Sequence, residues 1–414
     1  MKKLVALLLA LTLCIGLCAC GATAEKPAEE TPATTGETET PATDAKDIKV
    51  GFIFLHDENS TYDLNFINAA KAAAAELGLS DDQIMMKTNI AESQACYDAA
   101  AELVDAGCDL VITDSFGHES FALAAAKEFP EVQFVSCTGV KAHTEGLSNF
   151  HNAFASIYEG RYLAGVAAGL KLNEMIKNGD ITAEEAKMGY VGAYPYAEVK
   201  SGYTSFFLGA RSICPSVTME VTFTSSWYDE ALEKEAANKL INNGCVLISQ
   251  HADSMGAPTA CETAGVPNVS YNGSTVAACP NTFIVSSRID WTPFFVYAIN
   301  CVASGEDIGY DWTGTLATGS VVLTEVNEQA AAAGTVEKIA EVMKALEDGS
   351  VKVFDTATFT VNGETVTTYL ADVDDLGDYV GETEAVSDGV FLESYYRSAP
   401  YFDLDIDGIT NLDA

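Results

Sequence analysis

Short fragments that pair aromatic rings with small polar groups recur between residues 187 and 297 of this chain. Each follows an apolar run of strand type, which is the place where open α/β sheets bind their ligands. An aromatic ring can stack on a flat ligand, and nearby hydroxyl, amide or carboxylate groups can bind its edge. The fragments are Gly192–Tyr196, Ser226–Asp229, Gln250–Ser254, Ser270–Gly273 and Ile289–Trp291. This pattern indicates recognition of a small molecule.

Two earlier fragments, Ser60–Asn65 and Asp114–Gly117, occupy the same position after apolar runs in the first half of the chain. Their side chains suit either a ligand or the cap of a following helix. Trp227 is open to two interpretations as well, because a tryptophan in such a loop is either a core residue or a stacking platform. Sequence alone leaves these alternatives open.

Sequence signatures of catalysis are missing from the chain. It contains no GxSxG, GxxxxGK[ST], HExxH or GxGxxG motif. His251 has no second histidine at ligand spacing, so we predict no metal site. Carboxylates such as Asp57, Asp63 and Asp253 are common in a chain this acidic and do not indicate an active site. We therefore predict no catalytic residues and no cofactor.

The net charge narrows the range of partners. The 414 residues carry 60 acidic and 22 basic side chains, for a formal net charge of −38. Loss of Lys2 and Lys3 with a cleaved leader would make it about −40. Affinity for nucleic acid comes from Lys and Arg that neutralise phosphates, so nucleic acid is a poor partner. An acidic, solvated surface that aids solubility is the simpler interpretation.

The first 20 residues have the pattern of a secretion signal. Lys2 and Lys3 precede an apolar run that is too short for a membrane span. The run ends in Leu17-Cys18-Ala19-Cys20, which matches a bacterial lipobox, so Cys20 would carry the lipid; plain secretion is the alternative. Residues 21–47 are rich in Thr, Glu, Pro and Ala, and we predict a disordered tether. The protein would then be anchored on the extracytoplasmic face of the cell membrane.

The remaining eight cysteines lack the spacing of a zinc site. Several stand inside apolar patterns, so we expect small buried side chains. Export permits disulfides, and Cys261 with Cys279 is the pair to check.

From Ile48 onward, short apolar strands alternate with helices of about 12 residues, which indicates βαβ units on parallel sheets. Two successive series predict an α/β fold of two three-layer (αβα) lobes with a cleft between them. The first lobe would comprise residues 48–160 with part of 292–414, and the second residues 161–291. Residues 305–414 would complete the lobes and the hinge. Within them, residues 351–369 suggest a β-hairpin that turns at Asn362-Gly363.

As an ordered series, five stretches resemble the basic membrane protein family of substrate-binding lipoproteins, and within it a purine-binding subgroup. The likeness runs from about Ile48 to Ala303. The stretches are Thr113–Gly117, Tyr158–Gly165, Phe206–Arg211, Trp227–Asp229 and Gln250–Ser254.

This resemblance implies two Rossmann-like lobes of periplasmic-binding-protein type I, joined by hinge strands, that close on a ligand. Phe116 and Trp227 would sandwich a purine, Asp253 and Asn65 would bind its edge, and other residues would complete the wall. The candidate ligand residues are Tyr62, Asn65, Ser115, Phe116, Tyr194, Trp227, Asp253, Asn272 and Trp291. The implied partners are a purine-like solute and an ABC permease in the membrane, with the receptor itself a monomer.

Three departures from the family pattern concern the ligand. Ser60-Thr61-Tyr62 stands where the subgroup has Gly-Trp, Asn272-Gly273 replaces an aspartate expected to bind ribose, and Ile289 replaces a cationic or aromatic residue. A nucleobase, a nucleoside or another flat heterocycle is therefore compatible with the sequence. The alternatives are a receptor for a sugar or signalling molecule and, as an enzyme, an exported nucleoside hydrolase.

Overall fold

The structure is a computed structural model that describes residues 48–374, 376–377 and 379–413. The predicted leader at residues 1–20, its lipidation site Cys20 and the tether at 21–47 lie outside the described residues. None of the helices in the described ranges is both long and apolar enough to cross a membrane.

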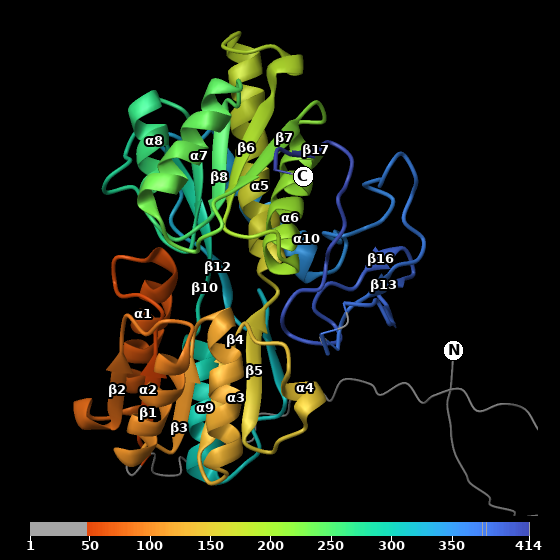
Figure 1. Cartoon of the computed structure of the whole chain (residues 1–414). Coiled ribbons are helices and arrows are strands. Elements are labelled where there is room, and N and C mark those ends of the chain that lie inside the picture. Colours follow the sequence, from red (N-terminus) through yellow and green to blue (C-terminus); the bar gives the residue numbers. More distant parts are fainter. Residues whose placement is uncertain (1–47, 375, 378, 414) are drawn as a thin grey trace, which may run out of the picture. The chain divides into compact units, whose positions relative to one another are not determined.

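The first lobe is built on a six-stranded parallel sheet with the strand order β11-β5-β4-β3-β1-β2 (Figure 1). Its strands are β1 Val50–Ile53, β2 Ile84–Lys87, β3 Leu110–Thr113, β4 Gln133–Cys137, β5 Phe150–Ala155 and β11 Asp311–Gly314. Its helices are α1 Thr61–Leu77, α2 Gln94–Asp105, α3 Glu119–Glu128, α4 Ala142–Glu145 and α9 Thr292–Ser304.

Alternation of side chains along the strands places two cores on this sheet. Phe52 faces α1 and α9, and its ring lies 5.1 Å from that of Phe295. The next residue, Ile53, belongs to the core under α2 and α3. Both faces of the parallel sheet are therefore covered, as the uninterrupted apolar runs predict.

The second lobe has a seven-stranded sheet with the order β12-β10-β9-β8-β6-β7-β17, in which only β12 runs antiparallel to its neighbour. Its strands are β6 Lys187–Gly192, β7 Thr218–Phe223, β8 Leu247–His251, β9 Asn268–Tyr271, β10 Phe283–Ile289, β12 Val321–Leu323 and β17 Ile409–Asn411. Helices α5 Ile157–Asn178 and α6 Ala197–Ile213 cover one face, and α7 Glu230–Asn242 and α8 Gly256–Ala264 cover the other.

Two glycines let α5 and α6 pack backbone against backbone. A methyl group on Gly165 would lie 2.0 Å from the carbonyl oxygen of Phe206, and one on Gly209 would lie 2.0 Å from that of Tyr162. Both glycines stand in stretches on which the family resemblance rests. Part of that resemblance therefore reflects helix packing.

The chain crosses between the lobes three times, after β5, after β10 and after β11. Ser156 N–H donates to Gly314 O at 2.7 Å, and Asp290 N–H donates to Ser320 O at 2.7 Å. These bonds tie the crossing segments to one another. The expected fold of two αβα lobes is confirmed.

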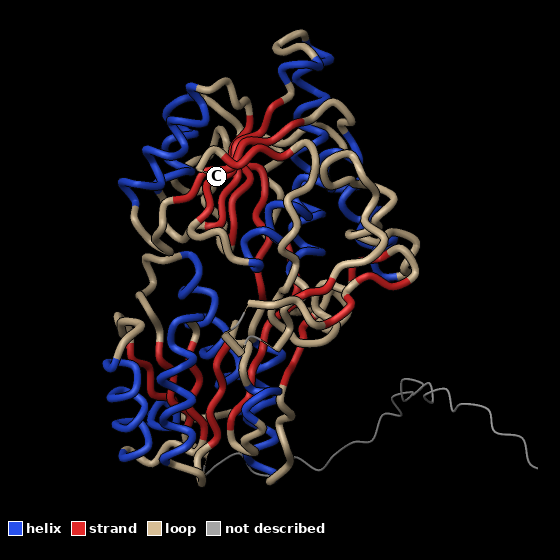
Figure 2. The backbone as a smooth tube through the Cα atoms, turned by 45° about the vertical axis from the view of Figure 1, so that its right-hand side comes forward, coloured by secondary structure: helices blue, strands red, loops and turns tan. Residues whose placement is uncertain are grey.

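The last part of the chain contributes to both sheets and then forms a small body of its own. Residues 305–413 supply β11 to the first sheet and β12 and β17 to the second. They also contain α10 Thr335–Glu347 and the short strands β13 Leu370–Ala371, β14 Thr383–Glu384, β15 Val386–Ser387 and β16 Val390–Phe391. Most of residues 348–408 is loop (Figure 2). Its core includes Phe354, stacked on Phe402 with ring centroids 4.4 Å apart.

The hairpin predicted over residues 351–369 is wrong except at its turn. Asn362 and Gly363 have φ of 53° and 80°, and Val361 pairs with Glu364 through two backbone hydrogen bonds. No ladder continues from this pair within residues 351–369. The turn residues encode the local bend, but the flanking chain packs on other elements instead of on itself.

All eight cysteines of the described residues are buried free thiols, as their apolar settings predict. Cys261 and Cys279 form no disulfide.

Candidate ligand-binding site

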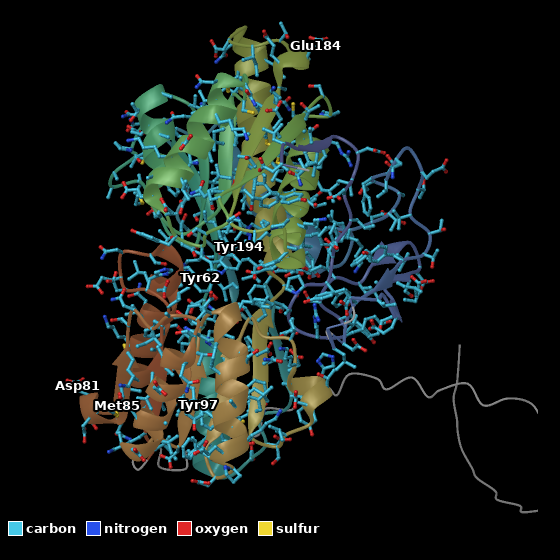
Figure 3. All side chains as sticks on the ribbon, in the orientation of Figure 1. Tyr62, Asp81, Met85, Tyr97, Glu184 and Tyr194 are labelled. Carbon is cyan, nitrogen blue, oxygen red and sulfur yellow. The ribbon has the colours of Figure 1, made fainter. Side chains whose placement is uncertain are left out.

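Side chains from the carboxyl ends of strands in both sheets enclose one narrow space, which we call the inner cavity. It is lined by Leu55, Tyr62, Ser115, Phe116, Thr138, Glu198, Trp227, His251 and Asp253. Its volume of about 20 Å³ suits a single water molecule, so a heterocycle requires the lobes to separate or the rings to shift. Tyr62 of the first lobe and Tyr194 of the second mark the facing ends of the two sheets (Figure 3).

The first-lobe wall is organised by Asp63, in the first turn of α1. Ser60 caps that helix by accepting from Asp63 N–H, and its hydroxyl donates to Asp63 Oδ2 at 2.6 Å. His56 N–H donates to Asp63 Oδ1 at 2.7 Å. Burial opposes ionisation of this carboxyl, but hydrogen bonds from His56, Asp114 and Ser60 outweigh it and lower the pKa of Asp63.

Asp114, which directly follows β3, has its pKa shifted in the opposite direction. Burial and the neighbouring charge of Asp63 raise the pKa of Asp114 well above its usual range. One of its oxygens accepts from Leu55 N–H at 3.1 Å. Its backbone carbonyl accepts from the Tyr62 hydroxyl at 2.6 Å, which fixes the Tyr62 ring at the cavity. The pKa values of the two carboxyls are therefore shifted in opposite directions, and Asp63 is the first of the pair to ionise.

Ser115 and Phe116 follow β3 directly. The Ser115 hydroxyl donates to Glu92 Oε1 at 2.5 Å, and the same oxygen accepts from Gly117 N–H at 2.9 Å. These two bonds fix the loop, and 38% of the surface of the Phe116 side chain is exposed. An exposed aromatic ring on a fixed loop is well suited to stacking.

The second-lobe wall is aromatic. Tyr194 and Tyr196 stack with ring centroids 5.1 Å apart, and Trp227 meets Tyr194 edge to face at 5.1 Å. Asp253 N–H donates to Trp227 O at 3.0 Å, which joins the loops after β7 and β8. The Phe116 ring of the opposite lobe lies 5.7 Å from Tyr196. Aromatic rings thus approach one another from both sides of the cleft.

Two buried polar residues complete this wall. Burial, together with the charges of Asp63, Glu233 and Glu198, raises the pKa of Asp253 well above its usual range, which favours its neutral form. Burial lowers the pKa of His251, whose Nε2 lies 3.3 Å from Glu198 Oε1. A protonated acid and a neutral imidazole can each donate and accept, which suits the edge of a heterocycle.

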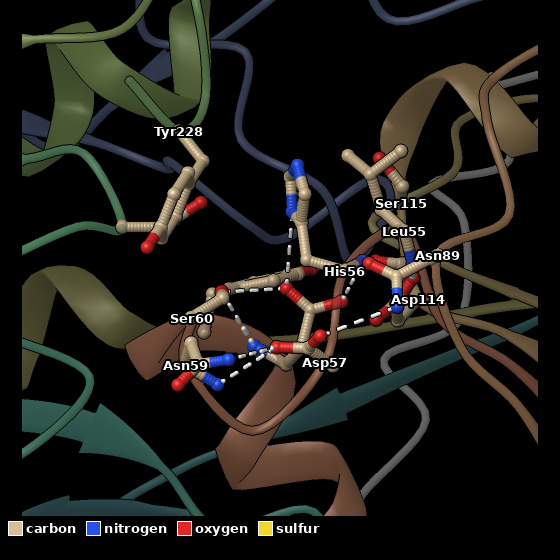
Figure 4. A network of polar contacts seen from close by, with 12 residues as sticks. Leu55, His56, Asp57, Asn59, Ser60, Asn89, Asp114, Ser115 and Tyr228 are labelled. Carbon is tan, nitrogen blue, oxygen red and sulfur yellow. Dashed lines mark hydrogen bonds and ion pairs between the residues drawn. The ribbon is translucent and has the colours of Figure 1, made fainter. Parts of the chain in front are cut away.

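Direct contacts join the lobes across the cleft. Thr61 N–H donates to Asp253 O at 3.0 Å, and the Thr61 hydroxyl reaches the same oxygen at 3.2 Å. The His56 and Tyr228 rings lie 5.2 Å apart, each from a different lobe (Figure 4). The two lobes are therefore in a closed arrangement, in contact across the cleft.

The structure gathers five of the nine candidate residues in the inner cavity: Tyr62, Ser115, Phe116, Trp227 and Asp253. Tyr194 contacts Trp227 edge to face. Asn65 and Asn272, joined by a 3.4 Å hydrogen bond, line a neighbouring cavity of about 370 Å³. Asn272 also donates to Asp253 at 3.4 Å and so touches the inner group.

Trp291 is placed elsewhere. It is 1% exposed and stacks on Phe66, with centroids 4.5 Å apart, in the core beneath α1 and α9. It lines neither the inner cavity nor the neighbouring cavity beside Asn65 and Asn272, and we leave it out of the proposed site.

Four lining residues were not among the candidates: Leu55, Thr138, Glu198 and His251. Thr138 directly follows β4 and His251 ends β8, so their positions at strand ends were a usable signal. Glu198 lies in the first turn of α6, where an acidic residue is ordinary and carries no such signal.

One group of carboxylates within the described ranges has the spacing of a metal site. Ligand atoms of Asp372, Asp374 and Glu382 lie within 4.8 Å of one another. Asp374 accepts from Leu376 N–H and Glu382 accepts from Val373 N–H, so both serve as loop acceptors. We assign no ion to this group.

Two αβα lobes with a cleft lined by aromatic rings and polar groups between them are the architecture of solute-binding proteins. Solved structures share the architecture. An ABC transporter solute-binding protein of Aeropyrum pernix matches with TM-score 0.62 and 18% identity over 74% of this chain and 92% of that one. A counterpart from Conexibacter woesei gives TM-score 0.58 and 19% identity over 74% and 98%. The fold is that of periplasmic-binding-protein type I.

The chain belongs to the family described as ABC transporter substrate-binding protein PnrA-like, which matches residues 53–353. A purine-binding protein of Brucella abortus is 31% identical over 62% of this chain and 69% of its own length. A putative ABC transporter glucose-binding protein of Haloferax volcanii is 31% identical over 52% of each chain. The chain thus spans about half the length of the second relative.

Proposed function

We propose that this protein is a lipid-anchored extracytoplasmic receptor that binds a purine nucleobase or nucleoside between its lobes and delivers it to an ABC permease. The observation that carries the proposal is that Phe116 and Trp227, from opposite lobes, line the same narrow cavity beside the buried acid Asp253. The family match and the similarity to a purine-binding protein support the same ligand class.

The cavity chemistry suits a flat, polar heterocycle. Rings approaching from both lobes can stack on its two faces, and each stacked base gains about 1–3 kcal/mol. The raised pKa of Asp253 favours its protonated form, and that form can donate to a ring nitrogen and accept from an exocyclic amino group at the same time. Neutral His251 offers a further donor or acceptor.

Lobe closure is the motion we propose for binding. Thr61, Asp253, His56 and Tyr228 form contacts that exist only when the lobes meet. Ligand that bridges Phe116 and Trp227 would add to these contacts and favour the closed state. A permease could then distinguish loaded from empty receptor.

The proposed location rests on the leader sequence. Lys2 and Lys3, the apolar run and the lipobox ending at Cys20 support export and attachment of lipid. Two or more acyl chains on Cys20 give stable anchoring without a membrane-spanning helix.

Calorimetric titration of the full-length chain in detergent tests the ligand. We expect one or two of adenine, hypoxanthine, guanosine and inosine to bind with a Kd in the micromolar range or tighter after bound solute is removed by unfolding and refolding. Glucose belongs in the same panel because of the Haloferax volcanii relative. Binding of glucose with no response to any purine would overturn the proposal, and release of free base from a nucleoside would indicate a hydrolase.

Trp227→Ala tests the stacking platform. We expect affinity for the purine to fall by about 1–3 kcal/mol while the thermal unfolding midpoint stays unchanged. Tyr395→Ala, at a side chain that is 73% exposed, is the matched control. Loss of folding instead would place Trp227 among the core residues.

A further inference from the structure

A second and larger cavity adjoins the inner cavity, and we call it the outer chamber. Its volume is about 440 Å³, within the range of small-molecule sites. Phe116, Thr138 and Glu198 line both spaces, so the two share a wall. A group attached to a ligand in the inner cavity has an adjoining space here.

The outer chamber is walled chiefly by residues beyond the family match at 53–353. The segment 354–413 supplies Tyr369, Asp372, Tyr379, Arg397, Tyr401 and Asp403. This segment is attached to both lobes. Lys200 Nζ of α6 lies 2.9 Å from Asp403, and Ser398 N–H donates to Asp311 Oδ1 of β11 at 2.8 Å. The wall is therefore a fixed part of the closed arrangement.

The chamber presents acceptors and rings. Carboxylates of Glu198, Asp372 and Asp403 lie among tyrosine side chains. The guanidinium of Arg397 donates to the backbone carbonyls of Val373, Ala399 and Pro400, so these donors are turned toward its own segment. Such a lining repels phosphate, and it attracts hydroxyl groups, which donate to carboxylates, or an ammonium, which also interacts with aromatic faces.

A buried hydroxyl points to a ligand independently of these charges. Thr138 is 4% exposed and lines both cavities, and its Oγ1 finds no hydrogen-bond partner among the described residues. A buried polar atom without a partner costs about 1–3 kcal/mol. A ligand that passes from the inner cavity to the outer chamber would satisfy it.

We propose that the outer chamber is a second subsite, which binds a hydrogen-bond-donating, non-anionic substituent of the ligand and excludes phosphate. The proposal rests on the function proposed above. It specifies the ligand as a heterocycle that carries hydroxyl or amine groups. The segment 354–413 then determines specificity.

The test compares matched ligands on the full-length chain by calorimetry. The probes are adenine, adenosine, 5′-amino-5′-deoxyadenosine and adenosine 5′-monophosphate, with the corresponding guanine series. We expect adenosine or its 5′-amine to bind about tenfold more tightly than the base, and the monophosphate to bind more weakly than the nucleoside. Asp372→Asn should reduce the preference for the amine over the monophosphate by about fivefold, and Asp372→Lys should favour the monophosphate.

Asp388→Asn is the matched control, because it makes the same charge change in the same segment at an exposed residue that does not line the chamber. Equal affinity for base, nucleoside and monophosphate, or equal effects of Asp372→Asn and Asp388→Asn, would overturn the second subsite while leaving the proposed function intact. If none of the bases and nucleosides binds, the proposed function itself fails.

Discussion

Each wall of the cleft holds a loop through a buried carboxyl group, and the pKa values of the two groups are shifted in opposite directions. In the first lobe, Asp63 accepts from His56 N–H and the Ser60 hydroxyl, and its pKa is lowered. In the second, Glu233 accepts from Ser254 N–H at 3.2 Å and Asp229 N–H at 3.2 Å. Burial and the charge of Asp229 outweigh those bonds and raise the pKa of Glu233 to about 7.

This difference shows that burial alone does not decide ionisation. Asp63 receives short hydrogen bonds from several donors, including a neighbouring acid that keeps its proton, so the charged form is favoured. Glu233 receives longer bonds and lies near another acid, so the neutral form is favoured. Each wall holds its loop through a buried acid, but the two walls should respond to pH in opposite directions.

Removal of Asp63 should give the largest effect. In Asp63→Ala, the His56 amide, the Ser60 hydroxyl and the Asp114 carboxyl lose their shared partner. We expect the free energy of unfolding to fall by about 4 kcal/mol, measured by urea denaturation. Glu58→Ala, an exposed acid of the same loop, should change it by less than about 0.5 kcal/mol. A loss no larger than this control would mean that the network does not support the wall.

The pH response of the second wall should come next in size. The folded pKa of Glu233, about 7, lies above its ordinary value of 4.5, so the folded state binds this proton more tightly than the unfolded state. The contribution of Glu233 to the free energy of unfolding is complete below about pH 4.5. It is lost as pH rises through 7, and the loss is at most about 3 kcal/mol. Asp63 has the opposite sign, because its lowered pKa stabilises the fold above its ordinary value of 3.8 and that contribution is lost on acidification.

Glu233→Gln should remove the loss of stability with rising pH that comes from Glu233. Urea denaturation at a series of pH values between 5 and 8 would show the wild type losing stability relative to the variant as pH rises. Glu393, whose buried carboxyl also has a pKa raised to about 7, changes stability in the same direction in both proteins, so the difference isolates Glu233. Glu235→Gln, at an exposed position of the same helix, should follow the wild type. Parallel curves for all three proteins would contradict the protonated wall.

The smallest effect should come from the ring contact between the walls. Tyr228→Ala removes the ring that lies 5.2 Å from His56 across the cleft. We expect closure to weaken by about 1 kcal/mol, which lowers ligand affinity about fivefold with the unfolding midpoint unchanged. Calorimetric titration with the best purine measures it, with Tyr395→Ala as the exposed control. Unchanged affinity would show that this contact does not contribute to closure.

Most strands and helices could be predicted from the sequence because their signals are local. The capping residues Ser93 and Asp229 mark the starts of α2 and α7. Before residue 305, two strands have weaker signals in the sequence. β2 is a short, half-exposed edge strand, and β5 contains buried His151 and Asn152, whose side chains bond backbone and side-chain groups of other elements. A strand that contains polar residues lacks an uninterrupted apolar run and is therefore difficult to predict from the sequence.

Sequence by itself determined the two βα series, the family and the fact that aromatic and polar fragments stand at strand ends, because strand and helix signals depend on neighbouring residues. Only the tertiary structure decided which fragments meet. Trp227 and Trp291 occupy similar positions after strands, yet Trp227 reaches the cleft while Trp291 is buried under Phe66 and α9. Glu198 and the wall contributed by residues 369–403 join the site through contacts between distant segments, and such contacts leave no periodic trace in the chain.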